Sequence, residues 1–350
     1  MKRGLLSTLG WMLRPIQREL PLDIRSVRSV LILRHDALGD AILATPVWRA
    51  LKAANPAIHI GVAGSLRNIA FLKLDEDIDE TVTLSRSIFR SLRELRNARR
   101  TKWDVVINLF FHDKTRGALF ARLAAPGAVS VTMVRDPVKD AAVALLYTRA
   151  GIRPKELTPM VTQNCMALEQ AITLGSAIKD IVPTLPRRLR GFTDSNIPTG
   201  KYIILHVEAS QDYKEWGLPN SGELTKRILE RYPSITIYWT SSEVRAEEAR
   251  AALRTIHSPR ASYLATPSLE ELCAAVRGAA AVVSPDTSVI HIAVAQQVPL
   301  VGLFMEPNEF LPFTALARVL FASNGKKASA ISVDAVLEAL KEYLPAQIEA

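Results

Sequence analysis

Short apolar runs and longer amphipathic segments alternate along the chain. In the first half, runs rich in Val and Ile predict strands, and apolar residues at helical spacing predict helices: strands 30–34, 58–63 and 103–109, helices 40–54, 87–100 and 115–124. The second half resumes the alternation, with strands 201–207, 235–239, 280–284 and 299–304 and helices 221–231, 243–253, 268–277 and 287–296. Because the strands are apolar on both faces, they indicate parallel sheets covered by helices, an α/β fold.

A break in this alternation predicts two domains. Residues 181–200 carry three prolines and two glycines, which is typical of a linker, and 350 residues exceed what one core usually holds. We therefore expect one α/β domain at 29–180 and a second at 201–350, with a C-terminal helix that can pack back on the first. Ligands of such sheets bind beyond the carboxyl ends of the strands, so two facing domains would share a central cleft.

Residues 1–28 form a basic segment with an apolar face. They hold six Lys or Arg residues and two acidic ones, and their apolar residues recur at helical spacing: Leu5, Leu6, Leu9, Met12, Leu13 and Ile16. Such a helix fits an anionic membrane surface, and it fits equally a helix docked on the protein itself. A signal peptide fits less well because no A-x-A-like cleavage site follows. No run reaches the roughly 18 apolar residues of a membrane-spanning helix.

Composition narrows the class of protein further. Hydrophobic residues make up 48% and charged residues 23%, which argues against a disordered chain. The balance is basic, with 44 Lys and Arg against 35 Asp and Glu. Cys165 and Cys273 lie far apart without metal-like spacing, so we expect a reduced, intracellular protein with no disulfide framework.

The first candidate site is RHDALGD, directly after the strand run VLILR. Gly39 allows a tight turn there, and Asp40 falls at or near the N-terminus of the next helix. Asp40 can be a helix N-cap, and Asp36 can stabilise the loop, because both residue types are common at these positions. On local grounds capping is the better interpretation, so the segment needs a second signal before it indicates catalysis.

The second candidate site is SPDTSVIHIAVAQQVP, which follows the strand run AAVVS. Asp286 and Thr287 would open a helix, whose N-terminal N–H groups and dipole form a natural phosphate site. His291 lies four residues after Thr287, on the same helical face. A half-buried structural histidine is an equally good interpretation of His291 alone. The joint pattern of strand, Pro-Asp-Thr, helix and His favours a phosphate site.

Two further segments follow predicted strands. In HVEASQDYKEWGLPN, Ser210 and Lys214 can donate to phosphate oxygens, although a loop lysine is usually just solvated. In YWTSSEVRAEE, Glu243 can accept hydrogen bonds from ribose hydroxyls, as acidic residues after strands do in nucleotide-binding domains. An acidic first turn of a helix is the more common local explanation for Glu243.

Together these motifs resemble the bacterial heptosyltransferase family, the lipopolysaccharide core enzymes of glycosyltransferase family 9. LGDAILATPVWRALKAANP resembles its first motif, KEWGLP its Lys-x-Trp-Pro element, and SPDTSVIHIAVAQQVPLVGLF its Asp-Thr-Gly-x-x-His segment. WDVVINLFFHDKTRGALFARL resembles its middle strand and helix. The resemblance covers roughly residues 29 to 304 in the family's order.

The resemblance implies a GT-B fold, meaning two Rossmann-like domains with parallel sheets facing a central cleft. Its first domain, 29–180, would take the acceptor, and 201–350 would bind the nucleotide sugar. The family's reaction moves heptose from ADP-heptose to a lipid A–Kdo or heptose acceptor, inverts the anomeric centre and uses neither metal nor cofactor. The enzyme would work at the cytoplasmic face of the inner membrane, in peripheral contact with anionic lipid and without nucleic acid.

The resemblance also assigns residue roles. Asp40 would be the general base, and Lys214 would assist departure of the diphosphate. Donor binding would fall to Ser210, Glu243, Asp286, Thr287, Ser288 and His291. Acceptor binding would fall to His35, Asp36, Arg67, Lys114 and Arg116, although His35 and Asp36 can instead shape their loop.

Three departures from the family pattern leave alternatives open. Ser288 replaces the usual Gly, where a side chain can crowd a phosphate, Gln296-Gln297 replace the usual Leu-Gly, and MEPNEFLPF lacks the common Gly-Pro-Thr. The alternatives are transfer of another nucleotide sugar to a surface glycan, or a member that binds nucleotide or glycan without transferring. An epimerase of the same fold is disfavoured by the LGD element.

Overall fold

The protein consists of two compact units. The computed structural model describes residues 15–84, 88–111, 114–176, 178, 181–323 and 325–344, apart from the side chains of 88–92 and 114. One unit comprises residues 1–184 and the other 185–350, so the boundary falls inside the predicted linker 181–200. Most of the apolar face predicted for the N-terminal segment belongs to residues 1–14, which lie outside the described residues.

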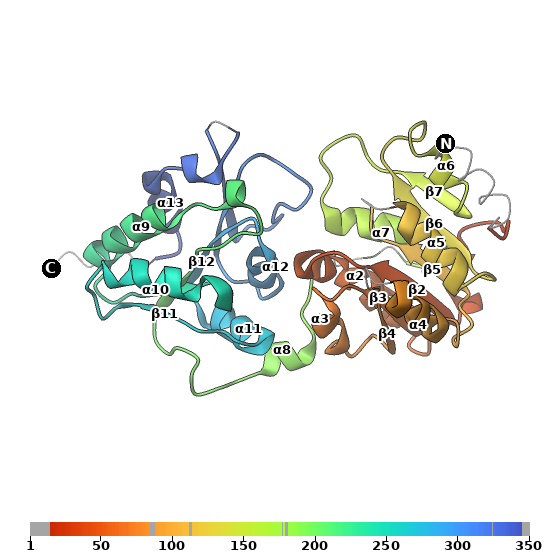
Figure 1. Ribbon diagram of the computed structural model, residues 1–350, viewed down its shortest axis with the longest axis horizontal. Coiled ribbons are helices and arrows are strands. Elements are labelled where there is room, and N and C mark those ends of the chain that lie inside the picture. The colour runs from red at the N-terminus through yellow and green to blue at the C-terminus, as the bar shows by residue number, and fades with distance from the viewer. Residues whose placement is uncertain are drawn as a thin grey trace. The chain divides into compact units, whose positions relative to one another are not determined.

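In the described part of the first unit, a six-stranded parallel sheet has the order β4-β3-β2-β5-β6-β7 (Figure 1). The strands are β2 (Ser29–Arg34), β3 (His59–Gly64), β4 (Glu80–Thr83), β5 (Val105–Asn108), β6 (Val129–Val134) and β7 (Arg149–Ile152). The helices are α2 (Leu38–Ala54), α3 (Ile69–Lys73), α4 (Ile88–Ala98), α5 (Lys114–Ala124), α6 (Ala141–Ala144) and α7 (Met160–Ala171). Helix α2 packs against α3 and α7, and α4 packs against α5.

The second unit repeats this order in the residues described. Its six parallel strands run β11-β10-β9-β12-β13-β14. They are β9 (Tyr202–His206), β10 (Thr236–Thr240), β11 (Ala261–Tyr263), β12 (Ala281–Pro285), β13 (Leu300–Phe304) and β14 (Ala317–Phe321). The helices are α8 (Arg187–Gly191), α9 (Leu218–Arg231), α10 (Ala246–Arg254), α11 (Leu269–Gly278), α12 (Ser288–Ala295) and α13 (Val333–Leu340).

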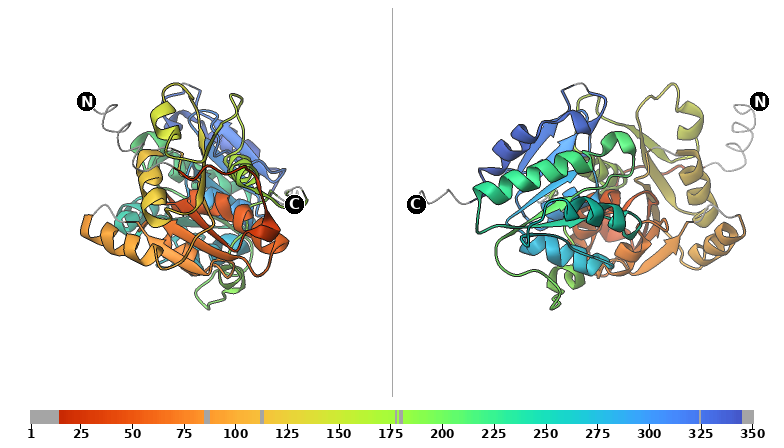
Figure 2. Two further views of the ribbon diagram at one scale, coloured as in Figure 1. Left: turned by 90° about the vertical axis from the view of Figure 1, so that its right-hand side faces the viewer. Right: turned by 60° about the vertical axis from the view of Figure 1, so that its left-hand side comes forward.

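Short elements complete both units. A two-stranded parallel sheet pairs β1 (Leu22–Asp23) with β8 (Ile172–Thr173). The 3-10 turns are η1 (Ile24–Ser26), η2 (Asp212–Lys214), η3 (Glu243–Arg245) and η4 (Ala328–Ala330). Figure 2 shows the layers of helix and sheet from two further directions.

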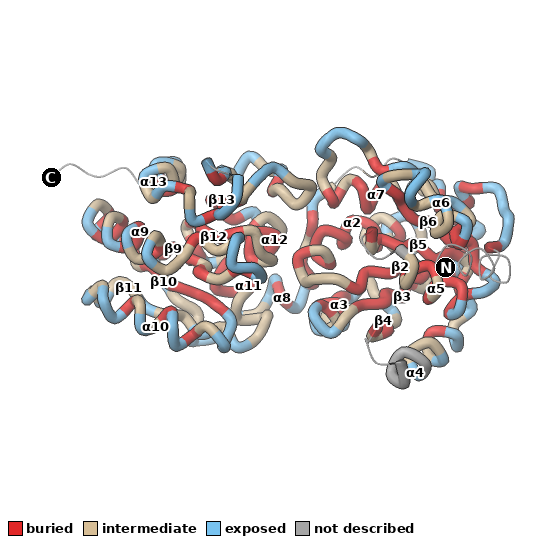
Figure 3. The backbone as a smooth tube through the Cα atoms, turned by 45° about the horizontal axis from the view of Figure 1, so that its top comes forward, coloured by how far each residue is buried: buried red, intermediate tan, exposed pale blue. Residues whose placement is uncertain are grey.

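The cores confirm the expected layering. Strands β2, β5 and β6 are buried along their whole length, and the tube in Figure 3 shows the same for the centre of each sheet. In the second unit, α9, α10 and α13 contribute to one apolar core over the sheet, around the fully buried Trp239. Its indole Nε1 donates to Thr225 Oγ1 at 2.9 Å, which satisfies the one polar atom in that core residue.

The strands and helices predicted between residues 30 and 304 are present within a few residues of their expected bounds. One expectation about the connections needs correction. Residues 187–191 of the predicted linker form α8, which packs on α11, and Arg277 donates to the carbonyls of Leu189, Arg190 and Phe192. Helix α13 packs against α9, β13 and β14 of its own unit.

Helix α2 contains a proline whose cost is offset locally. Pro46 has no N–H for the carbonyl of Ile42, four residues earlier. The hydroxyl of Thr45 donates to that carbonyl at 2.8 Å and accepts from the Thr184 N–H at 2.9 Å. One buried hydroxyl therefore satisfies two backbone groups.

Among the described residues, no helix is both long and apolar enough to cross a membrane.

We predict that Thr45→Val destabilises the protein by about 1–3 kcal/mol, because it leaves the buried Ile42 carbonyl and the half-buried Thr184 N–H without their partner. The measurement is equilibrium unfolding in urea. Thr255→Val is the matched control, since Thr255 makes the same kind of bond to a carbonyl three residues earlier but is exposed. Equal losses in the two variants would contradict the prediction.

Candidate active site

The predicted site residues of each unit follow the central strands of its sheet. In the first unit, Asp36 and Asp40 follow β2, Arg67 follows β3, and Arg116 lies in the helix after β5. These three strands are neighbours, and the chain leaves β2 toward β3 on one side and resumes at β5 on the other. A crevice forms at such a reversal of strand order, at the carboxyl ends.

The polar residues at the carboxyl ends of β2, β3 and β5 are called the first half-site. Arg34, the last residue of β2, bonds to several groups in it. Its side chain is 1% exposed. Nη2 donates to Asp40 Oδ1 at 2.7 Å, Nε donates to the Asp40 carbonyl at 3.0 Å, and Nη1 donates to the Leu109 carbonyl. The guanidinium therefore ties the start of α2 to the end of β5. The sequence signal for this residue is a charged side chain closing the apolar run VLIL.

Asp40 occupies the third position of α2, and the N-cap is Ala37. Its second carboxylate oxygen, Oδ2, accepts from the Ala37 N–H at 3.3 Å. Asp40 thus makes the backbone contact that a capping residue makes, while its side chain stays 18% exposed. Its contact with Arg34 and its place beside the crevice go beyond what a cap requires.

Asp36 lies beside the same guanidinium. Its Oδ1 is 3.3 Å from Arg34 Nε, and the side chain is 14% exposed. Burial raises the pKa of the Asp36 carboxyl to about 7, Arg34 and Arg67 act to lower it, and the charge of Asp40 raises it further. The Asp36 carbonyl accepts from the Ser65 hydroxyl at 2.7 Å, which links this loop to the one after β3.

The remaining predicted acceptor residues differ in exposure. His35 is 9% exposed, and its ring centre lies 4.1 Å from that of Phe110. Arg67 is exposed and Arg116 is half-buried, whereas the side chain of Lys114 lies outside the described residues. Of the two roles expected for His35 and Asp36, their burial favours shaping the loop.

The second half-site is built on three neighbouring strands, β10, β9 and β12. Lys214 belongs to η2 after β9, and its Nζ lies 2.6 Å from Asp286 Oδ2 after β12. The two side chains are 29% and 12% exposed, so the pair is partly desolvated. It brings a cation to the segment that leads into α12.

The segment after β12 places its polar groups as the sequence predicts. Thr287 is the N-cap of α12; its hydroxyl accepts from the Val289 N–H at 3.3 Å and lies 3.0 Å from the Ser284 hydroxyl. Ser288 is the first residue of the helix and is half-buried, and His291 is 5% exposed. The helix N-terminus carries the partial positive charge that favours phosphate.

Glu208 is a residue of this site that sequence reasoning overlooked. Its carboxylate accepts from the Ser242 N–H at 2.6 Å and from the Ser242 hydroxyl at 3.0 Å. Glu208 therefore holds the loop that carries Glu243, whose side chain is exposed, as is that of Ser210. The available signal was a carboxylate just after a strand, the same one that identified Glu243.

His206, at the end of β9, supports the same loop. Its Nδ1 lies 3.1 Å from Thr240 Oγ1 at the end of β10. Burial lowers the pKa of the imidazole to about 4, against the opposing charge of Glu208, so the ring is neutral at pH 7. This contact joins β9 and β10, the strands that precede the turns containing Lys214 and Glu243.

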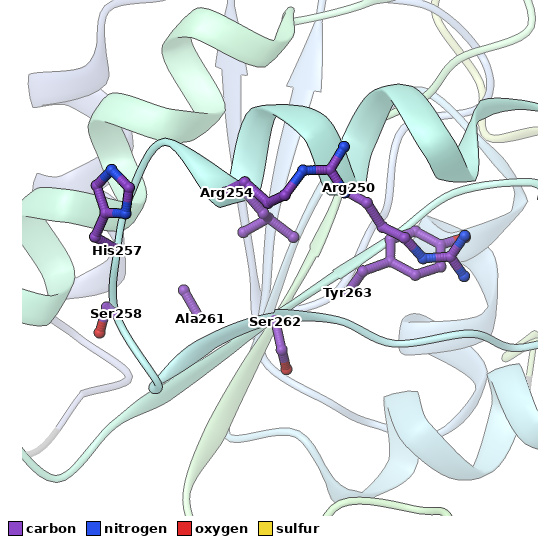
Figure 4. A pocket seen from close by; sticks show the side chains of 8 residues that line it. Arg250, Arg254, His257, Ser258, Ala261, Ser262 and Tyr263 are labelled. Carbon is purple, nitrogen blue, oxygen red and sulfur yellow. The ribbon is translucent and has the colours of Figure 1, made fainter.

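A cavity of about 400 Å³ lies on the outer edge of the second sheet (Figure 4). Helix α10, the following loop and β11 line it with Arg250, Leu253, Arg254, His257, Ser258, Ala261, Ser262 and Tyr263. The Arg250 guanidinium carbon lies 4.5 Å from the centre of the Tyr263 ring, and Arg250 Nη1 lies 2.6 Å from Glu247 Oε1. None of the predicted site residues lines this cavity.

The described residues contain no group of three or more His, Cys, Asp or Glu side chains suited to a metal ion.

Known proteins were compared with this chain. The family described as glycosyltransferase family 9 (heptosyltransferase) matches residues 88–336. A comparison with curated proteins finds no match. Escherichia coli heptosyltransferase WaaC, solved with ADP, is 17% identical with a TM-score of 0.75, over 90% of this chain and 100% of that one.

Two further solved structures have similar scores. A glycosyl transferase family 9 protein from Veillonella parvula is 19% identical, with a TM-score of 0.73 over 93% of this chain and 98% of its own. Escherichia coli ADP-heptose lps heptosyltransferase II is 19% identical, with a TM-score of 0.71 over 90% and 98%. At these identities the structures establish the fold, and the family match covers most of the chain. The chain therefore belongs to glycosyltransferase family 9, the heptosyltransferase family, and is a glycosyltransferase with the GT-B fold.

Proposed function

We propose that this glycosyltransferase moves a heptose from ADP-heptose to the inner core of a lipopolysaccharide, inverting the anomeric centre without a metal ion. The observation that carries the proposal is the pairing of two half-sites on one chain. In the first unit, the Asp40 carboxylate is bonded to Arg34 where the strand order of the sheet reverses. In the second unit, Lys214 and the N-terminus of α12 lie at the corresponding reversal.

The donor assignment is supported by the second half-site and by the relatives. One WaaC structure contains ADP and another contains ADP-2-deoxy-2-fluoro heptose. In this chain, Lys214 and the N–H groups at the start of α12 would bind the diphosphate, and Glu243 would accept from the ribose. Because the Ser288 side chain stands at the helix start, another nucleotide sugar remains the alternative donor.

The proposed reaction is a single displacement. The acceptor oxygen forms a bond to the anomeric carbon while the bond from that carbon to the diphosphate oxygen breaks. Asp40 accepts the hydroxyl proton, and the negative charge departs with ADP. Lys214 and the α12 dipole stabilise that charge. Two hydrogen bonds hold the Asp40 carboxylate in one orientation, which suits a base that must meet an incoming hydroxyl.

Membrane contact is the third part of the proposal. We place the enzyme at the cytoplasmic face of the inner membrane, where a glycolipid acceptor is available. Around α6 and β7, large apolar side chains are exposed: Val138 81%, Leu145 65%, Ile152 57% and Leu157 51%. The N-terminal segment reaches the same edge, since the Thr148 hydroxyl donates to the Ile16 carbonyl at 3.1 Å and Arg149 to that of Leu20 at 2.7 Å.

We predict that Asp40→Asn lowers kcat by about 10²–10⁴-fold, because the amide cannot take the acceptor's proton. Calorimetry should find its affinity for ADP unchanged. Asp77→Asn is the matched control, since Asp77 also pairs with an arginine of the first unit, at 2.6 Å from Arg49 Nη1. Turnover near that of the wild type in the Asp40 variant would show that Asp40 only caps α2.

The donor half-site leads to a second prediction. Lys214→Ala should lower kcat by about 10²–10³-fold through loss of leaving-group stabilisation, whereas Thr287→Ala and His291→Ala should weaken ADP binding measured by calorimetry. Lys226→Ala, at an exposed lysine of α9, is the control. Undiminished ADP affinity in both of the latter variants would overturn the phosphate-site assignment. Loss of activity on adding a chelator would overturn the metal-free scheme.

The membrane contact is tested with vesicles. Val138→Asp combined with Leu145→Asp, or removal of residues 1–14, should reduce co-sedimentation with phosphatidylglycerol vesicles and raise KM for a membrane-embedded acceptor. Each Lys or Arg near such a surface adds about 1 kcal/mol, so high salt should weaken binding. Phe313→Asp with Leu316→Asp is the control, since both are exposed apolar residues of the second unit. Equal loss in the control would contradict a specific contact surface.

A further inference from the structure

One buried guanidinium serves two carboxyl groups in the first half-site. Arg34 Nη2 is 2.7 Å from Asp40 Oδ1, and Arg34 Nε is 3.3 Å from Asp36 Oδ1. Arg34 is 1% exposed, and Asp36 and Asp40 are 14% and 18% exposed. A single positive charge cannot neutralise two carboxylates, and a second negative charge in a desolvated site is expensive.

The two carboxyl groups are bound unequally. Asp40 accepts hydrogen bonds through both of its oxygens, from Arg34 and from the Ala37 N–H. The single Nε–H of Arg34 is directed at the Asp40 carbonyl at 3.0 Å, so it is not available to Asp36. Asp36 Oδ1 is buried and has no hydrogen-bond donor among the described residues. Arg34 therefore gives Asp40 hydrogen bonds that it does not give to Asp36.

The charged groups acting on Asp36 come from three elements. Arg34 of β2 and Arg67 of the loop before α3 favour its ionised form, whereas Asp40 of α2 opposes it. Burial is the largest influence and raises the pKa of Asp36 to about 7. Asp36 therefore exchanges its proton near neutral pH.

We propose that Arg34, Asp36 and Asp40 act as one unit, in which Arg34 positions Asp40 as the base and the ionisation of Asp36 sets how strongly Asp40 attracts a proton. This inference rests on the proposed role of Asp40 in transfer. When Asp36 loses its proton to solvent, its negative charge lies beside the Arg34 guanidinium that holds Asp40, and the proposal is that this charge strengthens Asp40 as a base. A stronger base removes the acceptor's proton more readily.

The first test is the pH dependence of kcat with a saturating nucleotide-sugar donor and a truncated core glycolipid. In the wild type, kcat should rise about threefold between pH 6 and 8, because the charge that Asp36 acquires strengthens the neighbouring base. Asp36→Asn should remove this rise and keep kcat at the low-pH level. Asp136→Asn is the matched control, because Asp136 is in the same unit and the pKa of its carboxyl is lowered instead.

A conservative change tests the positioning role of Arg34. Arg34→Lys keeps the positive charge, but one ammonium cannot reach the Asp40 carboxylate, the Asp40 carbonyl and the Leu109 carbonyl in the guanidinium's fixed geometry. We expect kcat to fall about tenfold while KM for donor and acceptor stays unchanged. A change in KM alone, or an Asp36→Asn variant with the wild-type rise in kcat, would overturn the proposal.

The second test measures stability and does not depend on transfer. Because the pKa of Asp36 is raised in the folded protein, the folded state binds more protons than the unfolded chain between pH 3.8, the ordinary pKa of an aspartate, and about pH 7. The contribution of Asp36 to stability is therefore fully present below pH 3.8 and is lost as the pH rises through about 7. Relative to wild type, Asp36→Asn should gain thermal stability as the pH is raised from 5 to 8.

The two tests separate the inference from the proposed function. A stability difference between wild type and Asp36→Asn that does not change with pH would refute the titration of Asp36, whatever the activity. If that stability difference changes with pH but the protein transfers no sugar, the proposed function is refuted, and with it the role of Asp40 as base. If the stability difference changes with pH and kcat also rises with pH, the inference is supported.

Discussion

The reversal of strand order in each sheet is the constraint on which the site depends. In both units the first long strand of the sheet, β2 or β9, lies at the centre, with the next strand on one side and a later one on the other. Connections that leave in opposite directions cannot cover the carboxyl end between them. The loops after β2, β3 and β5, and those after β9, β10 and β12, therefore gather their polar residues at two such ends.

Each half-site contains a cation bonded to a carboxylate in a partly desolvated place. Arg34 with Asp40, and Lys214 with Asp286, lie at the carboxyl ends of central strands. Removing such charges from water is costly, and hydrophobic residues would often stabilise the protein equally well. Paired charges of this kind also cluster at functional sites. In the proposed transfer, the hydrogen bonds to Asp40 would orient the base, and Lys214 would stabilise the charge on the departing diphosphate.

Polar contacts tie these loops to one another. The Asn68 side-chain amide donates to the Arg34 carbonyl at 2.8 Å, and the Ser65 hydroxyl to that of Asp36. In the second unit, Glu208 binds Ser242, and His206 contacts Thr240. The exposed Glu243 therefore lies on a loop that is held at Ser242, which reduces the entropy lost when a ligand binds.

Sequence pattern by itself determined the fold class, the segments that hold the candidate site, and most of the inner strands: β2, β3, β5, β9, β10, β12 and β13. These strands are largely buried on both faces, so they form continuous apolar runs. Strand β6 is equally buried but was not predicted, because Ser130 and Thr132 interrupt its apolar run. Strands β4, β7, β11 and β14 lie at sheet edges, where partial exposure admits polar residues, and no apolar run announces them. The sequence also identified four site residues, because each of them follows a recognisable strand: Asp40, Lys214, Asp286 and Thr287.

Only the tertiary structure decided which of these residues touch. Lys214 and Asp286 are 72 residues apart, and Arg34 and Leu109 are 75 apart, so no local pattern could pair them. The same holds for Glu208, whose partner lies on another loop, and for α8, whose docking on α11 turned a predicted linker into part of the second unit. Asp36 shows the limit most clearly. Its sequence position indicated a loop carboxylate, but burial beside a guanidinium already committed to Asp40 is a property of the folded chain alone.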